Sequence, residues 1–253
     1  MDITTILGLI IGVGGILLGQ LLEGGNIQQL LQITAAFIVF GGTIGACVVS
    51  FPQEELINAG KFAKMAFVNS TLDPKKVIEE VIGYAQKARK EGVISLEKDA
   101  REATDIILKM GLESVSDGAD PVIVREMLET KLEQMANEVK AAAKVWESAG
   151  GYSPTIGIIG AVLGLIQVMQ NLSDPSKLGA GIAVAFVATV YGVGFANLLA
   201  IPMSSKIKIK LEKEVIVKTI MIEGILAIQA GESPVLIERK LNAYRLGEIE
   251  EGQ

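Results

Sequence analysis

The chain has 253 residues, of which half are hydrophobic but only 5% aromatic, with 28 glycines and a formal net charge of −6. Its mean hydropathy of +0.44 is that of a membrane protein, and glycine is more frequent in membrane helices than in soluble ones. The lack of histidine excludes Ser-His-Asp, Cys-His and His-metal sites, and the acidic charge disfavours nucleic-acid binding. The single cysteine, Cys47, lies in an apolar run and is interpreted as a packing residue.

Four uncharged segments are long enough to cross a bilayer, which takes about 20 apolar residues in a helix. They span residues 3–22, 33–51, 155–172 and 178–203. The first is not interpreted as a signal peptide, because no early Lys or Arg precedes it and a second apolar segment follows at once. We expect a transmembrane hairpin over 1–51, with helices at about 3–22 and 30–51, and another over 154–203, with helices at about 154–172 and 178–203.

The distribution of basic residues predicts the orientation. Fourteen Lys and Arg lie between residues 51 and 153 and eight lie after residue 203, whereas only Lys177 lies between the third and fourth segments. Lys and Arg are retained in cytoplasmic loops. We therefore expect both termini, a domain over residues 52–153 and a tail over 204–253 to be cytoplasmic.

The cytoplasmic regions are predicted to be helical. Residues 53–68 are expected to continue the second membrane helix, residues 74–90 and 95–110 to form two helices joined near Gly92, and residues 122–149 to form a long amphipathic helix. Residues 206–217 alternate like a strand, but they follow a membrane helix without a turn, so we expect a helix there. Ser153-Pro154 is a usual helix start, with an N-cap residue before a first-turn proline. The fold class is thus an all-α integral membrane protein with four transmembrane helices, a helical domain between the second and third, and a helical tail.

The membrane segments contain no Asp, Glu, Lys or Arg. Ion transfer through a bilayer usually needs an ionisable group at depth, so a conducting chain of this kind would take its carboxylate from a partner. Thr189 lies about halfway along the fourth segment. Its hydroxyl is expected either to bond back to its own helix or to line a pore. Pairs such as Gly160/Gly164 and Gly192/Ala196 put small residues on one helix face and predict close packing, within or between subunits.

Three passages resemble the MotA/TolQ/ExbB ion-channel superfamily, and within it the MotA family of flagellar stators. These are SPTIGIIGAVLGLI at 153–166, ATVYGVGFANLLAIP at 188–202 and ARKEGVISLE at 88–97. The third passage and the two membrane helices before the cytoplasmic domain favour MotA over TolQ and ExbB. The stretch after Glu97 lacks the Asn-Pro that many relatives have, which leaves the local turn open.

The resemblance implies an ion-conducting stator subunit of the bacterial inner membrane, not an enzyme, and with no cofactor besides the transported ion. Five copies would form a ring around two single-span MotB chains, which carry the ion-binding Asp and anchor to peptidoglycan. The rotor protein FliG would bind the cytoplasmic domain through the residues that match the family's charged pair, Arg89 and Glu97.

The resemblance also implies roles in the membrane. Thr189 matches the threonine that faces the MotB Asp, and Pro154 and Pro202 match prolines that shape the conformational cycle. Ala161 matches a position where sodium-driven members tend to carry Thr, so we expect proton coupling, with Thr155 as a further hydroxyl of the pathway. The alternatives are a sodium-driven stator, a TolQ/ExbB-like energiser of an envelope complex, and a membrane scaffold without ion flux.

Overall fold

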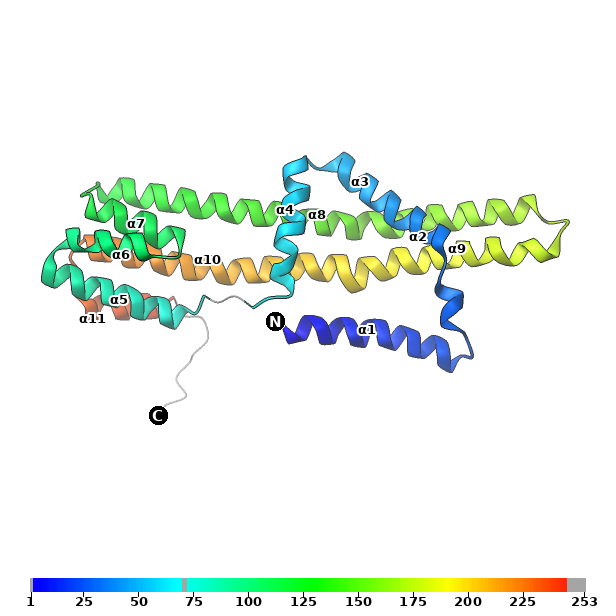
Figure 1. Ribbon diagram of the computed structural model, residues 1–253, viewed down its shortest axis with the longest axis horizontal. Coiled ribbons are helices and arrows are strands. Elements are labelled where there is room, and N and C mark those ends of the chain that lie inside the picture. Colours follow the sequence, from blue (N-terminus) through cyan, green and yellow to red (C-terminus); the bar gives the residue numbers. More distant parts are fainter. Residues whose placement is uncertain (1, 70–71, 245–253) are drawn as a thin grey trace. The chain divides into compact units, whose positions relative to one another are not determined.

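The computed structural model describes residues 2–69 and 72–244, and every secondary-structure element within them is helical (Figure 1). The chain divides into two compact units. Unit 1 comprises Met1–Asn69 and Glu138–Ile209, and unit 2 comprises Ser70–Asn137 and Lys210–Gln253. The predicted all-α fold with four helices apolar enough to span a membrane is confirmed.

Unit 1 contains the four apolar spans. Its elements are α1 (Ile3–Leu22), η1 (Ile27–Leu30), α2 (Ile33–Ala36), η2 (Phe37–Gly41), α3 (Gly42–Ser50), α4 (Gln53–Phe62), η3 (Ala63–Ala66), α9 (Pro175–Phe195) and η5 (Ala196–Ala200), with the C-terminal part of α8 (Pro121–Gln170) and the start of α10 (Ile201–Gln229). At about 1.5 Å of rise per residue, the 20 residues of α1 match the hydrocarbon core. The domain boundaries predicted at residues 51, 153 and 203 stay predictions about the membrane.

The C-terminal half of α8 and α9 run antiparallel and touch through glycine (Figure 1). A β-carbon on Gly157 would stand 2.8 Å from the Ala188 carbonyl oxygen, and one on Gly164 would stand 2.6 Å from the Gly181 carbonyl oxygen. Only glycine permits such an approach of two helix backbones, where dispersion supplies association energy that the hydrophobic effect cannot supply in lipid. The predicted close packing at Gly160/Gly164 is therefore present within a single subunit.

The second apolar span is not one regular helix. Its middle, η2, is a π-helical turn. Ala35 of α2 and Val39 of η2 pack against Val187 and Ala188 of α9. The expected continuation of this helix through residues 53–68 is wrong. Phe51 is extended because Pro52 follows it, and a proline pushes the residue before it away from helical geometry.

A helix start was predicted at Ser153-Pro154, but α8 continues through Pro154 without a break. The local pattern predicted Ser153 as an N-cap, and this prediction is wrong. Ser153 lies inside the helix with no exposed surface, and its Oγ donates to the carbonyl oxygen of Gly192 on α9 at 3.0 Å. Pairing with the neighbouring helix holds this segment helical although the proline lacks a backbone donor.

Unit 2 is a helical domain with a conventional hydrophobic core. Its elements are α5 (Pro74–Glu91), η4 (Val93–Leu96), α6 (Glu97–Glu102), α7 (Ile106–Ser116) and α11 (Pro234–Asn242), with the start of α8 and the end of α10. Fully buried side chains from all of these elements meet in the core, among them Val81, Leu96, Ile107, Ile225 and Leu241. The helix predicted over residues 95–110 is interrupted at Ala103, which is extended, before Asp105 caps α7.

Candidate functional site

Thr189 and Ala161 lie at the same level of the α8–α9 hairpin. The residues that precede them touch, since a β-carbon on Gly160 would stand 2.6 Å from the β-carbon of Ala188. Thr189 is half-buried, and its Oγ1 donates to the carbonyl oxygen of Ala185 one turn earlier at 3.3 Å. At 3.3 Å this bond is long for a hydroxyl donor, so the hydroxyl keeps capacity to interact with a group that approaches α9.

Thr155 lies about one to two turns along α8 from Ala161, close to the level of Gly192. It is exposed, and its Oγ1 donates to the carbonyl oxygen of Tyr152 at 2.7 Å. The structure thus does not bring Thr155 next to Thr189. Of the three predicted pathway residues, Thr189 and Ala161 share one level of the hairpin, and Thr155 lies at another.

Pro202 is the second residue of α10, separated by one residue from the π-helical turn η5, which ends at Ala200. In a regular α-helix its backbone nitrogen would donate to the Leu198 carbonyl, but proline has no N–H and its ring clashes with that carbonyl. A π turn shifts the hydrogen-bond register and is a known way to absorb such a mismatch. The local irregularity of this helix therefore has an identifiable cause in Pro202.

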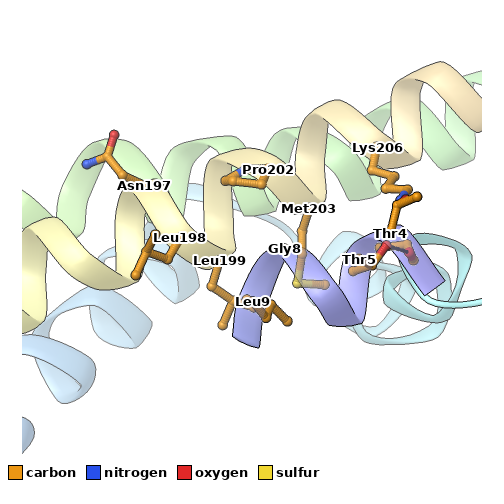
Figure 2. A pocket seen from close by; sticks show the side chains of 11 residues that line it. Thr4, Thr5, Gly8, Leu9, Asn197, Leu198, Leu199, Pro202, Met203 and Lys206 are labelled. Carbon is orange, nitrogen blue, oxygen red and sulfur yellow. Dashed lines mark hydrogen bonds between the residues drawn. The ribbon is translucent and has the colours of Figure 1, made fainter. Parts of the chain in front are cut away.

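A groove lies between α1 and the segment formed by η5 and the start of α10 (Figure 2). Leu9, Leu198, Pro202 and Met203 line its apolar part. A β-carbon on Gly12 would stand 3.0 Å from Leu198 Cδ2, so α1 approaches η5 beyond the groove as well. The ring of Pro202 is exposed there, which leaves it free of close packing on that side.

One polar connection in unit 1 was missed by sequence reasoning. The Lys206 ammonium contacts Asp2 Oδ1 at 2.9 Å and donates to Thr4 Oγ1 at 2.7 Å (Figure 2 shows Thr4 and Lys206). Thr5 Oγ1 also donates to the Ala66 carbonyl oxygen at 2.7 Å. These bonds fasten the N-terminal end of α1 to α10 and to η3. Asp2 and Lys206 are 204 positions apart, and nothing in either local sequence signals the pairing.

In unit 2, the predicted rotor residues Arg89 and Glu97 flank a tight corner. Arg89 is exposed on the last turn of α5 and Glu97 is exposed as the first residue of α6. The turn between them starts at Gly92, whose φ of +84° favours glycine. Glu97 pairs with Arg101 rather than with Arg89. The structure therefore places the two residues on one corner but not in contact.

An ion pair stabilises this corner. Lys87 Nζ lies 2.6 Å from Asp99 Oδ2, which links α5 to α6, and this hydrogen bond raises the pKa of the Lys87 ammonium. The residues after Glu97 form the short helix α6 although the Asn-Pro of many relatives is missing. Sequence reasoning did not identify Lys87 or Asp99, because they are ordinary members of a charge-rich stretch.

A buried ion pair inside unit 2 was also missed. Lys218 on α10 is 4% exposed, and its ammonium contacts Asp105 Oδ2 at 2.7 Å. Asp105 also accepts a hydrogen bond from the backbone nitrogen of Ile107 and so caps α7. A pair this deep is structural, since removal of one partner would leave a buried charge.

Two family models match the chain. The model of the motility protein A N-terminal region matches residues 6–92, and that of the MotA/TolQ/ExbB proton channel family matches residues 99–219. The first match disfavours the TolQ/ExbB-like alternative, because it covers the N-terminal hairpin. The families are those of a channel rather than of a known class of enzyme.

Named relatives and solved structures agree with these models. Motility protein A of Helicobacter pylori is 36% identical over 244 residues, which is 96% of this chain and 95% of that protein. The structure of C. jejuni MotAB superposes with a TM-score of 0.92 at 31% identity, over 99% of this chain and 98% of that one. The flagellar MotAB stator complex of Bacillus subtilis gives a TM-score of 0.88 at 32% identity, over 97% of both chains. The chain belongs to the MotA/TolQ/ExbB proton channel family, within its branch of flagellar stator proteins of the inner membrane.

Proposed function

We propose that the chain conducts protons inward together with a MotB-like single-span partner and converts this flow into rotation of the flagellar rotor. The observation that carries the proposal is the lack of any acidic or basic residue in the four apolar spans, with the Thr189 hydroxyl at mid-hairpin. A proton path of hydroxyls and backbone alone is incomplete. The missing acid is supplied by an Asp of the partner, which meets Thr189.

The two similar solved structures are of MotAB complexes, which supports a partner chain and an oligomeric assembly. The proposed stoichiometry is five copies of this chain around two partner chains. Large apolar side chains remain exposed on both helices of the α8–α9 hairpin, such as Ile159 and Val162 on α8 and Phe186 and Val190 on α9. Partner helices, neighbouring copies and lipid cover these surfaces in the assembly.

The proposed ion is H⁺. Ala161 contributes no hydroxyl at the level of Thr189, whereas Na⁺ coordination needs several oxygen ligands in place of its water. A proton needs only a titratable acid and water. No cofactor is required, and the chain catalyses no covalent reaction. Because each elementary charge that crosses the membrane potential releases about 2.3 kcal/mol per 100 mV, single proton passages can bias steps of ring rotation.

In the proposed orientation both termini and unit 2 lie in the cytoplasm, as the basic residues indicate. Unit 2 contacts the rotor protein FliG through Arg89 and Glu97. Their exposed positions on one corner support this assignment. Such charges steer the approach and set the register of a contact more than they add affinity.

The role of Thr189 is tested by Thr189→Val and Thr189→Ser in a host without stators, with the partner co-expressed. We expect Thr189→Val to abolish proton-driven swimming and Thr189→Ser to retain it. The matched control is Thr43→Val, because the Thr43 hydroxyl also bonds back one turn, to the Val39 carbonyl at 2.6 Å, but is buried. Normal swimming with Thr189→Val would support the scaffold alternative instead.

The ion is tested by swimming speed in sodium-free medium and after collapse of the proton gradient. Unchanged speed without Na⁺ and arrest on loss of the proton gradient are the expected results. Strict dependence on Na⁺ would replace the proton proposal by a sodium-driven stator. For the rotor contact, reversal of both charges, Arg89→Glu with Glu97→Lys, should impair rotation while the complex still assembles in the membrane.

A further inference from the structure

An exposed isoleucine lies between the two charged residues of the unit 2 corner. Ile94, in η4, has 72% of its surface exposed, while Arg89 precedes it on α5 and Glu97 follows it on α6. The neighbouring Leu96 is completely buried in the core of unit 2. Singly exposed apolar side chains are common on protein surfaces. What distinguishes Ile94 is its place between Arg89 and Glu97, the two residues of the proposed rotor contact.

The backbone holds Ile94 outward rather than leaving it on a loose loop. In a 3₁₀ helix, residues three apart lie on the same side, and here Val93 and Leu96 both pack on the core. Ile94 therefore points away from it. Ser95 Oγ donates back to the Gly92 carbonyl oxygen at 2.7 Å, which closes the turn. The Lys87–Asp99 ion pair links the two helices on either side.

Charged groups surround this side chain. Arg89, Lys90 and Glu91 are exposed at the end of α5. On the other side, Glu97 pairs with Arg101, and Lys98 lies 3.8 Å from Glu102. An apolar centre with a polar, charged rim is the usual arrangement of a protein–protein contact, in which the centre carries most of the binding energy.

We propose that Ile94 is the apolar anchor by which this corner docks into a hydrophobic pocket of the rotor protein, with Arg89 and Glu97 as the rim that sets the register. This inference rests on the proposed function and adds the residue that supplies affinity. The partner must offer an apolar pocket with an acid on the Arg89 side and a base on the Glu97 side. Because the corner is preorganised, docking costs little ordering of the backbone.

The charge pattern favours a protein over a lipid surface. Both signs alternate on the corner, and Glu91 and Glu97 lie among the basic residues. An anionic bilayer attracts clusters of Lys and Arg without interspersed acids. A second copy of this chain is the other conceivable occupant, and it becomes an outcome of the experiment because such a contact would be needed for assembly.

The test measures binding of purified FliG to the purified complex of this chain with its MotB-like partner in lipid nanodiscs. Burial of an isoleucine predicts about tenfold weaker binding for Ile94→Ala. The matched control is Val122→Ala, since Val122 is also 72% exposed on unit 2 but lies on the first turn of α8. Ile94→Leu should bind as the unchanged protein does, whereas Ile94→Asp should bind still more weakly than Ile94→Ala.

The salt dependence of binding distinguishes the apolar contribution of Ile94 from the charged contribution of Arg89 and Glu97. Exposed charges are screened as salt rises, whereas apolar contacts are not. The loss from Ile94→Ala should therefore persist at 0.5 M NaCl, where the loss from Arg89→Ala should shrink. Equal losses for Ile94→Ala and Val122→Ala, or disassembly of the complex with Ile94→Asp, would overturn the inference. If Ile94→Ala binds normally while the charge-reversed corner does not, the anchor is wrong but the rotor contact stands. If neither change affects binding or swimming, the rotor site itself is elsewhere.

Discussion

A β-carbon on Gly192 would stand 2.4 Å from the carbonyl oxygen of Ser153, on the helix against which α9 packs. The Ser153 hydroxyl in turn donates to the Gly192 carbonyl at 3.0 Å. The two residues therefore fix both the separation and the register of α8 and α9 where Pro154 interrupts the hydrogen bonding of α8. Any side chain on Gly192 must push the helices apart at the point where the proposed pathway begins.

Gly192→Ala is accordingly expected to destabilise unit 1 by about 1–3 kcal/mol, as overpacking does. Swimming should fail with it. The thermal midpoint of the purified complex provides the measurement. Gly194→Ala is the matched control on the same helix, because nothing lies within 4 Å of a β-carbon there. Equal midpoints for the two variants would show that the α8–α9 contact is not as close as the structure has it.

Pro202→Ala tests the origin of the π turn. Alanine restores an N–H that can donate to the Leu198 carbonyl, so η5 should relax towards a regular α-helix and gain up to about 3 kcal/mol. We expect slower hydrogen exchange over residues 198–204 and impaired rotation in a complex that still assembles.

Pro234→Ala is the control for Pro202→Ala. Pro234 is the first residue of α11, where a missing N–H costs no helical hydrogen bond. It should leave exchange and rotation unchanged. Unaltered exchange around residue 202 in Pro202→Ala would mean that packing, and not the proline, imposes the π turn.

The membrane spans could be predicted from the sequence because the signal is local, in the form of uncharged runs of sufficient length. The break at Pro52 could also have been predicted from a local signal, because a proline biases the residue before it out of helical geometry. The continuity of α8 at Pro154 could not. It depends on the contact of Ser153 with Gly192, 39 positions away, and a local rule favours a helix start there.

In the candidate site, too, residues with a local sequence signal could be predicted, whereas those that depend on distant contacts could not. Arg89 and Glu97 were predicted through a motif, and the structure adds that they flank one corner without touching. Ile94 carries no sequence signal, because an apolar residue in a helical domain is ordinarily expected in the core. The pairs Asp2–Lys206 and Asp105–Lys218 were missed since each joins residues more than 100 positions apart.

Lys206→Met should loosen the N-terminal end of α1. The Asp2 side chain is only 10% exposed, and the change removes the Lys206 ammonium from it, at a cost of about 1–2 kcal/mol. Faster hydrogen exchange in the first turns of α1 would report this. Lys208→Met is the control. The Lys208–Glu147 pair, at 2.6 Å, is shorter than the Lys206–Asp2 pair, at 2.9 Å, but both of its side chains are about half exposed, and exposed pairs contribute little. If the two variants exchange alike, burial does not distinguish the pairs.

The ion pairs of the Glu223 carboxylate allow a prediction of how the stability of unit 2 changes at acidic pH. It lies 2.7 Å from Arg125 and 3.5 Å from Lys240, and the hydrogen bond from Arg125 lowers the pKa of Glu223 from its ordinary 4.5. A carboxyl whose folded pKa is lowered stabilises the fold at pH values above the unfolded pKa, and this contribution is lost as pH falls through the folded pKa. Stability should therefore decline below about pH 4.5.

Glu223→Gln should remove this contribution at neutral pH, at a cost of about 1–2 kcal/mol, and flatten the decline in acid. Hydrogen exchange of α10 and α11 amides as a function of pH is the measurement. Glu129→Gln is the control, because Glu129 also binds Arg125, at 3.0 Å, but its side chain is 55% exposed against 13% for Glu223. Since solvent screens the exposed partner, only the Glu223 variant should change the acid response. An unchanged acid response in Glu223→Gln would assign the loss of stability in acid to other carboxylates of unit 2.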